Sequence, residues 1–151
     1  MAHDFKRFPE LTNSQLDIYY FESPHKQIFE DFRCEVIKVH DGDTITVRWF
    51  ERDFDFPIRL LGIDAPELSE EKGAESKYWL ESLILNKKVD IEIDPKNRVE
   101  KYGRLLGNII FNGINLGEEE VNLGKAKPFA QRTEGKIPEL NKELRISQWL
   151  T

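Results

Sequence analysis

The sequence predicts a single domain of the α+β class that is mainly β. Several short segments alternate apolar and polar residues with the two-residue period of a strand. Residues that favour turns separate these segments. Only one stretch between them has apolar residues at helical spacing, and the other helical patterns lie near the chain ends. With 151 residues, 39% of them apolar and 33% charged, the chain is long enough to bury a core of its own.

The N-terminal part is expected to be an extension, residues 1–30, attached to a main domain over residues 31–151. Thr12 and Gln15 have the spacing of a capping box, in which each side chain bonds the other residue's backbone N–H. We therefore predict a short helix that includes residues 16–20 and stops at the following Ser-Pro pair. Its apolar residues need cover, so we expect it to pack on the domain rather than act as an interaction arm.

Three strand patterns follow, beginning with residues 28–39. The turn His-Asp-Gly-Asp comes next, and Gly42 is expected there to supply an unusual backbone angle. A second strand is predicted over residues 44–50 and a third over residues 58–63, joined by the charged link 53–57.

Helical and strand patterns alternate in the rest of the chain. Helical spacing predicts a helix over residues 74–85. Strands are predicted over 88–94 and 104–111, and further helices over 115–123 and 138–150. Five strands, with one helix between the third and fourth and others after the fifth, fit a small closed barrel of the oligonucleotide-binding type.

Composition narrows the function classes. Lys and Arg total 22 against 28 Asp and Glu, a net charge of −6, so binding to a polyanion must depend on local positive charge and metal. The single Cys34 excludes an intrachain disulfide and is interpreted as a strand residue. No secretory signal or membrane-spanning run is found, so a cytoplasmic protein is expected. In the basic loop 95–102, Lys96, Arg98 and Lys101 are interpreted as solvated.

Acidic residues gather at the ends of the second and third strands. Asp41 and Asp43 precede the second strand, Asp64 and Glu67 follow the third, and Arg59 lies inside the third. If these strands pair, the carboxylates converge beside a guanidinium, which suits an oxygen-liking divalent cation and a phosphodiester. Four of these residues also have a plainer interpretation: the first two aspartates as turn residues, the glutamate as a residue of a helix N-terminus, and the arginine as the partner of a buried carboxylate.

Four segments together resemble the staphylococcal nuclease (thermonuclease) family, over roughly residues 34–149. They are VIKVHDGDTITV, IRLLGIDAPE, EKYGRLLGNI and NLGEEEVNLGKAK, and they occur in the family's order. The resemblance implies a five-stranded barrel with about three helices, to which the N-terminal helix is added. It also implies a calcium-dependent phosphodiesterase that cleaves the 5′ P–O bond of DNA and RNA and leaves 3′-phosphates.

The resemblance assigns a calcium site. The carboxylates of Asp43 and Asp64 and the main-chain carbonyl of Ala65 would bind the ion, and Asp41 would lie just outside them. Ala65 stands where Thr is common in the family, but a carbonyl ligand survives that change.

The resemblance also assigns roles in catalysis. Glu67 would be the general base, and Arg59 and Arg104 would bind the scissile phosphate. Further contacts to the substrate would come from Tyr102, Lys101 and Lys127.

Some positions depart from the family pattern. The loop after Glu67 is shorter. Ala130 falls near the position of a tyrosine that stacks on the substrate base in the best-known members, so that stacking must come from Phe129 or be weaker. We expect weaker and more salt-sensitive binding of single-stranded DNA or RNA, by a monomer that does not bind membranes. A catalytically silent binding module is the alternative, and a nuclease tuned to a special substrate, with the N-terminal helix as a docking arm, is a third idea.

Overall fold

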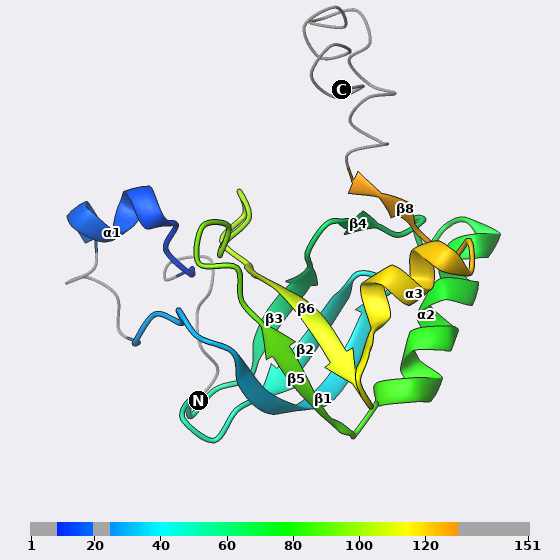
Figure 1. Cartoon of the computed structure of the whole chain (residues 1–151), viewed down its shortest axis with the longest axis horizontal. Helices are drawn as coiled ribbons and strands as arrows, with labels where there is room; N and C mark the ends of the chain where they lie inside the picture. The colour runs from blue at the N-terminus through cyan, green and yellow to red at the C-terminus, as the bar shows by residue number, and fades with distance from the viewer. Residues whose placement is uncertain (1–8, 20–24, 130–151) are drawn as a thin grey trace, which may run out of the picture.

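Five strands form a closed barrel in the computed structural model, which describes residues 9–19 and 25–129. The strands are β1 (Phe32–Asp41), β2 (Thr44–Arg48), β3 (Phe56–Leu60), β5 (Lys88–Glu92) and β6 (Leu105–Phe111). Neighbouring strands pair antiparallel in the order β3-β2-β1-β5-β6, and a parallel pairing of β3 with β6 closes the barrel (Figure 1). This is the five-stranded barrel of the oligonucleotide-binding type that the sequence predicts.

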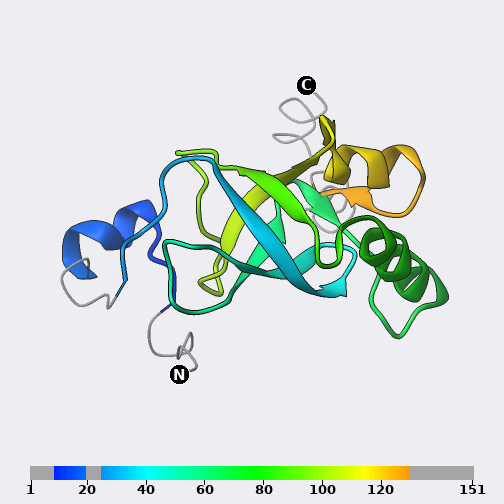
Figure 2. The same cartoon turned by 90° about the horizontal axis from the view of Figure 1, so that it is seen from below.

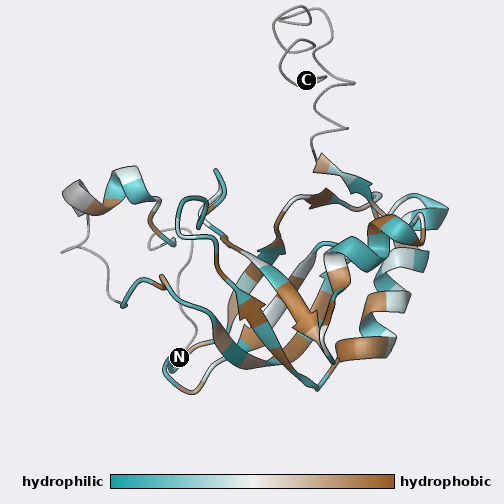
Figure 3. Ribbon diagram, in the orientation of Figure 1, coloured by the Kyte–Doolittle hydropathy of each residue, from teal (hydrophilic) through white to brown (hydrophobic). Residues whose placement is uncertain are grey.

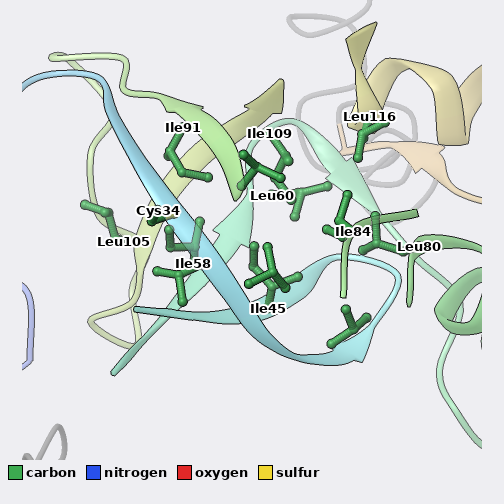
Figure 4. Close-up of a cluster of buried hydrophobic side chains, with 14 of the residues drawn as sticks. Cys34, Ile45, Ile58, Leu60, Leu80, Ile84, Ile91, Leu105, Ile109 and Leu116 are labelled. Carbon is green, nitrogen blue, oxygen red and sulfur yellow. The ribbon is translucent and has the colours of Figure 1, made fainter. Parts of the chain in front are cut away.

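The core fills the barrel interior because alternate strand residues point inward. Figure 4 shows labelled side chains from all five strands, with Leu80 and Ile84 of α2 and Leu116 of α3, gathered in one cluster. Cys34 lies in this cluster as a buried strand residue, as predicted. Figure 3 shows hydrophobic residues along the strands, whereas the loop between β5 and β6 is mostly hydrophilic.

Two helices lie at one end of the barrel. They are α2 (Glu71–Ile84) and α3 (Leu116–Asn122), and they pack on β1 and β6, respectively. The short α1 (Asn13–Tyr19) lies at the opposite end, as Figures 1 and 2 agree. Within the described residues, no helix is both long and apolar enough to cross a bilayer.

Three short strands complete the architecture. β7 (Ile114–Asn115) pairs with β6 and leads into α3. β4 (Ile63–Asp64) and β8 (Lys127–Pro128) pair with each other and form a separate small sheet beside the barrel.

The strands and helices predicted within the described residues are present, with shifted ends. The capping box at α1 is confirmed, since Thr12 N donates to Gln15 Oε1 (3.0 Å) and Gln15 N to Thr12 Oγ1 (3.3 Å). The helix predicted from residue 74 begins at residue 71. The helix predicted over 138–150 lies outside the described residues, and the division between residues 30 and 31 stays a prediction.

Two predictions about the strands and turns were wrong. The third strand does not continue to residue 63: it ends at Leu60, and Gly62, with φ of 77°, turns the chain into β4. Gly42 does not have a positive φ. It is required for space instead, because a Cβ there would lie 2.8 Å from the Ala65 Cβ and 2.9 Å from the Glu120 Oε1.

The interpretation of Arg98 as a solvated loop residue was also wrong. Its side chain is 2% exposed, and its guanidinium donates to the carbonyls of Ile28 and Leu11. Those bonds replace water around the charge, so burial is possible despite the polar loop.

Candidate functional site

A cleft of about 900 Å³ opens where the β1–β2 turn, β3, β4 and the β5–β6 loop meet. The predicted site residues Asp41, Asp43, Arg59, Asp64, Ala65, Glu67, Lys101, Tyr102 and Arg104 all line it. Segments more than forty residues apart in the chain therefore contribute to one cavity. Lys127 is exposed on β8, opposite Asp64 in the β4–β8 register, and is not among the residues that line the cleft.

The β1–β2 turn holds one carboxylate in a fixed orientation. Asp43 is buried, and its Oδ2 accepts a hydrogen bond from Ala65 N (2.8 Å) while its Oδ1 accepts one from Thr44 Oγ1 (3.0 Å). Its own N–H donates to Asp41 Oδ1 (3.0 Å). The bond to Ala65 ties this turn to the residue that follows β4, so the two acidic segments lie against each other.

Arg59 lies between the acidic segments. Its Nη1 donates to the carbonyls of Leu60 (2.8 Å) and Ile63 (3.0 Å), which fixes the guanidinium over the turn into β4. Its Nη2 lies 3.4 Å from Asp43 Oδ2 and 3.5 Å from Asp64 Oδ1. The arginine is thus the partner of a buried carboxylate, and it also lines the cleft, whereas its contact with a phosphate stays a prediction.

The second arginine comes from the start of β6. Arg104 Nε and Nη2 donate to the two carboxylate oxygens of Glu100 at 3.1 and 3.2 Å. Glu100 Oε1 also accepts the backbone N–H of Tyr102 and that of Arg104, each at 3.0 Å. One carboxylate therefore folds the tip of the loop and aligns the guanidinium. In the described part of the chain, Nη1 of this arginine makes no hydrogen bond.

Exposed residues stand at the edges of the cleft. Glu67 makes no side-chain hydrogen bond or ion pair with the described residues, and it lies in the loop between β4 and α2. Tyr102 is 71% exposed, with Lys101 Nζ 5.1 Å from its ring centroid. Phe129, which directly follows β8, also lines the cleft and is 51% exposed. The cleft thus combines carboxylates, guanidinium groups and exposed aromatic rings.

Comparisons with known proteins agree on one family. Residues 57–147 match the family described as staphylococcal nuclease homologue. An uncharacterized endonuclease of Escherichia coli is 34% identical over 117 residues, which are 76% of this chain and 73% of that protein. The chain belongs to the staphylococcal nuclease family.

Two further relatives extend the comparison. An uncharacterized endonuclease of Haemophilus influenzae is 35% identical over 98 residues, 65% of this chain and 53% of that protein. An uncharacterized protein of Methanocaldococcus jannaschii is 32% identical over 159 residues, 80% of this chain and 72% of that protein. The family match begins at Pro57, so the β1–β2 turn with its two aspartates lies before it.

In this staphylococcal nuclease homologue, burial sets the charge of the acidic turn. Burial, with the neighbouring Asp43 carboxylate, raises the pKa of Asp41 to about 6, although Arg59 opposes the shift. The bond to Glu100 raises the pKa of Arg104 above its ordinary value, so this guanidinium stays charged. A carboxylate whose ionisation is resisted in this way favours a cation beside it.

A buried acid behind the cleft was not predicted from the sequence. Glu120 of α3 is fully buried, and neither carboxylate oxygen has a hydrogen-bond partner among the described residues. Burial, and then the charges of Asp43 and Asp41, raise its pKa to about 9. It follows Leu116 by four residues, and that spacing places it on the apolar face of α3. This four-residue spacing was the sequence signal that could have identified the buried acid.

Side chains alone supply only part of a calcium site in this cleft. Among residues 9–19 and 25–129, no three acidic, histidine or cysteine side chains are grouped closely enough to hold a metal. The donors near the cleft are oxygens, from Asp43, Asp64 and the Ala65 carbonyl, and calcium accepts backbone carbonyls and water together with carboxylates. The raised pKa of Asp41 is an independent sign that positive charge is favoured here.

Proposed function

We propose that this chain is a calcium-dependent nuclease that hydrolyses phosphodiester bonds of single-stranded DNA or RNA. The supporting observation is that Arg59 of β3 and Arg104, which immediately precedes β6, line one cleft with a cluster of carboxylates. Membership of the family and the endonuclease relatives support the same reaction class. Hydrolysis of a phosphodiester uses both features, because guanidinium groups neutralise its negative charge while water attacks, and carboxylates can hold a metal ion that does the same.

Asp43, Asp64 and the Ala65 carbonyl would hold the ion in this proposal, with Asp41 beside them. Bound calcium supplies a Lewis acid and a template for a phosphate oxygen. The chain's own contribution is to fix these donors: Ala65 N and Thr44 Oγ1 hold both oxygens of Asp43 in place before anything binds.

The arginines would bind the remaining phosphate oxygens. Arg104 is aligned by Glu100 and keeps Nη1 for the substrate, while Arg59 is fixed by two backbone carbonyls and turns Nη2 toward the acidic cluster. Guanidinium groups match phosphate oxygens in geometry and stay charged at any working pH.

Glu67 would accept a proton from the attacking water. The water oxygen bonds to phosphorus, the bond from phosphorus to the 5′ oxygen breaks, and that oxygen leaves with the electron pair and takes up a proton. The products are a 3′-phosphate and a 5′-hydroxyl. An exposed carboxylate with no partner in the described part of the chain suits this role, since no internal bond must be broken.

Cleavage of labelled single-stranded DNA in calcium and in chelator tests the proposal. We expect cutting in calcium only, reduced about 10²–10⁴-fold in Glu67→Gln, as for loss of a general base. Arg104→Ala should lose about 10²–10³-fold, as for loss of a charge-stabilising donor. Glu70→Gln and Arg33→Ala are matched controls, because both residues lie outside the cleft. A wild-type protein that binds calcium and cuts nothing would favour the silent binding module.

A further inference from the structure

The segment Pro9–Asn13 lies against the loop that carries Tyr102 and Arg104. The backbone N–H of Glu10 donates to the Gly103 carbonyl (3.0 Å). Pro9 packs on the same glycine so closely that a Cβ on Gly103 would lie 2.3 Å from the Pro9 Cβ. Figure 1 shows α1, which this segment precedes, on the same side of the barrel as the β5–β6 loop. We call this segment, residues 9–13, the strap.

Buried Arg98 joins the strap to the base of that loop. Its Nη1 donates to the Leu11 carbonyl (3.0 Å) and to Asn13 Oδ1 (3.1 Å), and its Nε donates to the Ile28 carbonyl (2.7 Å). Asn13 Nδ2 in turn donates to the Pro95 carbonyl (2.8 Å). The strap therefore contacts the loop at its base and at its tip.

A second buried charge anchors the strap to the barrel. The carboxylate of Glu10 receives two bonds from Arg52, Nη1 to Oε2 at 2.8 Å and Nη2 to Oε1 at 3.1 Å. The two side chains are 1% and 4% exposed. The guanidinium lies 4.4 Å from the Phe56 ring centroid, at the start of β3. A buried pair of this kind fixes one geometry, because leaving either charge alone is unfavourable.

The anchored strap leads directly to the arginine of the cleft. Gly103, held by the strap, donates its N–H to the Glu100 carbonyl (2.9 Å). The Glu100 side chain then bonds the backbone and the guanidinium of Arg104. A continuous series of bonds thus runs from Arg52 through the strap to the phosphate-binding arginine.

We propose that the strap is a positioning element of the active site. It holds the loop 98–104 in the conformation that presents Tyr102 and Arg104 to the substrate, and this inference rests on the proposed nuclease function. The strap lies outside the family match, which begins at residue 57. The metal-binding residues do not contact it through any bond described above, so calcium binding should not depend on it.

The double variant Pro9→Gly/Asn13→Ala tests the proposal in the full-length chain. Both residues are at least partly exposed, so the variant removes contacts to the loop without opening the core. We expect kcat on a short single-stranded DNA to fall about tenfold, as for a small misplacement of a catalytic group. Calcium affinity should stay within about twofold, and amide hydrogen exchange should become faster for residues 98–104 but not for β1 and β2.

A core variant separates positioning from general destabilisation. Val89→Ala on β5 removes buried volume away from the strap and should lower stability without a selective loss of kcat. Glu10→Gln, which keeps the shape and removes the charge, should repeat the strap phenotype.

The outcomes distinguish the two proposals. Unchanged kcat in both strap variants, or exchange that is not faster in the loop, would overturn the positioning role. A wild-type protein that cuts nothing would refute the nuclease function itself, and loop exchange alone would then decide whether the strap orders residues 98–104.

Discussion

Replacing Glu120 by glutamine should stabilise the protein at neutral pH. The carboxyl group is fully buried in α3, has no hydrogen-bond partner among the described residues, and lies close to Gly42 of the acidic turn. Its charged form is disfavoured first by burial and then by the charges of Asp43 and Asp41. Glutamine has nearly the same shape and no charge, so the substitution removes only the ionisation.

The magnitude follows from the two pKa values. The pKa of Glu120 is 4.5 in the unfolded chain and about 9 in the folded protein. Below 4.5 both states hold the proton, so the group does not affect stability. Above that value the unfolded state releases the proton first, and the stability of the fold falls as the pH rises toward 9. At 1.36 kcal/mol per unit, the difference near pH 7 is about 3 kcal/mol.

Denaturant unfolding at about pH 5 and about pH 8, with chelator present, measures this difference. The Glu120→Gln variant should gain little over wild type at the lower pH and several kcal/mol at the higher pH. Glu118→Gln, an exposed position on the same helix, is the matched control and should change stability by less than about 0.5 kcal/mol. If the gain is the same at both pH values, the carboxyl does not remain protonated in the folded state and the reasoning is refuted.

Three further predictions concern the turn and the core. Calcium affinity should weaken as the pH falls through the Asp41 pKa of about 6, because protonation removes a negative charge beside the ion, and calorimetric titration measures it. Gly42→Ala should destabilise the fold by about 1–3 kcal/mol and lower calcium affinity, because its Cβ would collide with Ala65; thermal unfolding with and without calcium tests both effects. Burial raises the pKa of Cys34 to about 12, so thiol labelling near pH 8 should occur only after unfolding, and rapid labelling of the folded protein would contradict this.

The strands were predictable because burial differs between their two faces. In β5, Val89 and Ile91 are buried and their neighbours are exposed, which is the alternation that the sequence displays. The parallel pairing of Ile58 with Leu105 was not predictable from that pattern, since alternation shows which face is buried and not which strand lies beside it.

The acidic and arginine residues of the cleft were found by motif, but their internal partners were not. Arg98 resembles any solvated loop arginine in the sequence, because its bonding partners Leu11 and Ile28 lie 87 and 70 residues away. The role of Gly42 was likewise not predictable from the sequence. A glycine between two aspartates indicates a turn, and only the packed fold distinguishes an unusual φ from a lack of room for a Cβ.

The parallel pairing of β3 with β6, which closes the barrel, has a consequence for the protein during its synthesis. Synthesis delivers Arg59 on β3 well before Arg104 at the start of β6, and the two meet in one cleft only when these strands pair. Such long-range pairing forms late, after local helices and hairpins. A chain still attached to the ribosome at residue 100 therefore carries its acidic cluster and one guanidinium, but not the second. Under the proposed nuclease function, a chain at this stage could not yet cleave the RNA of its own translation machinery.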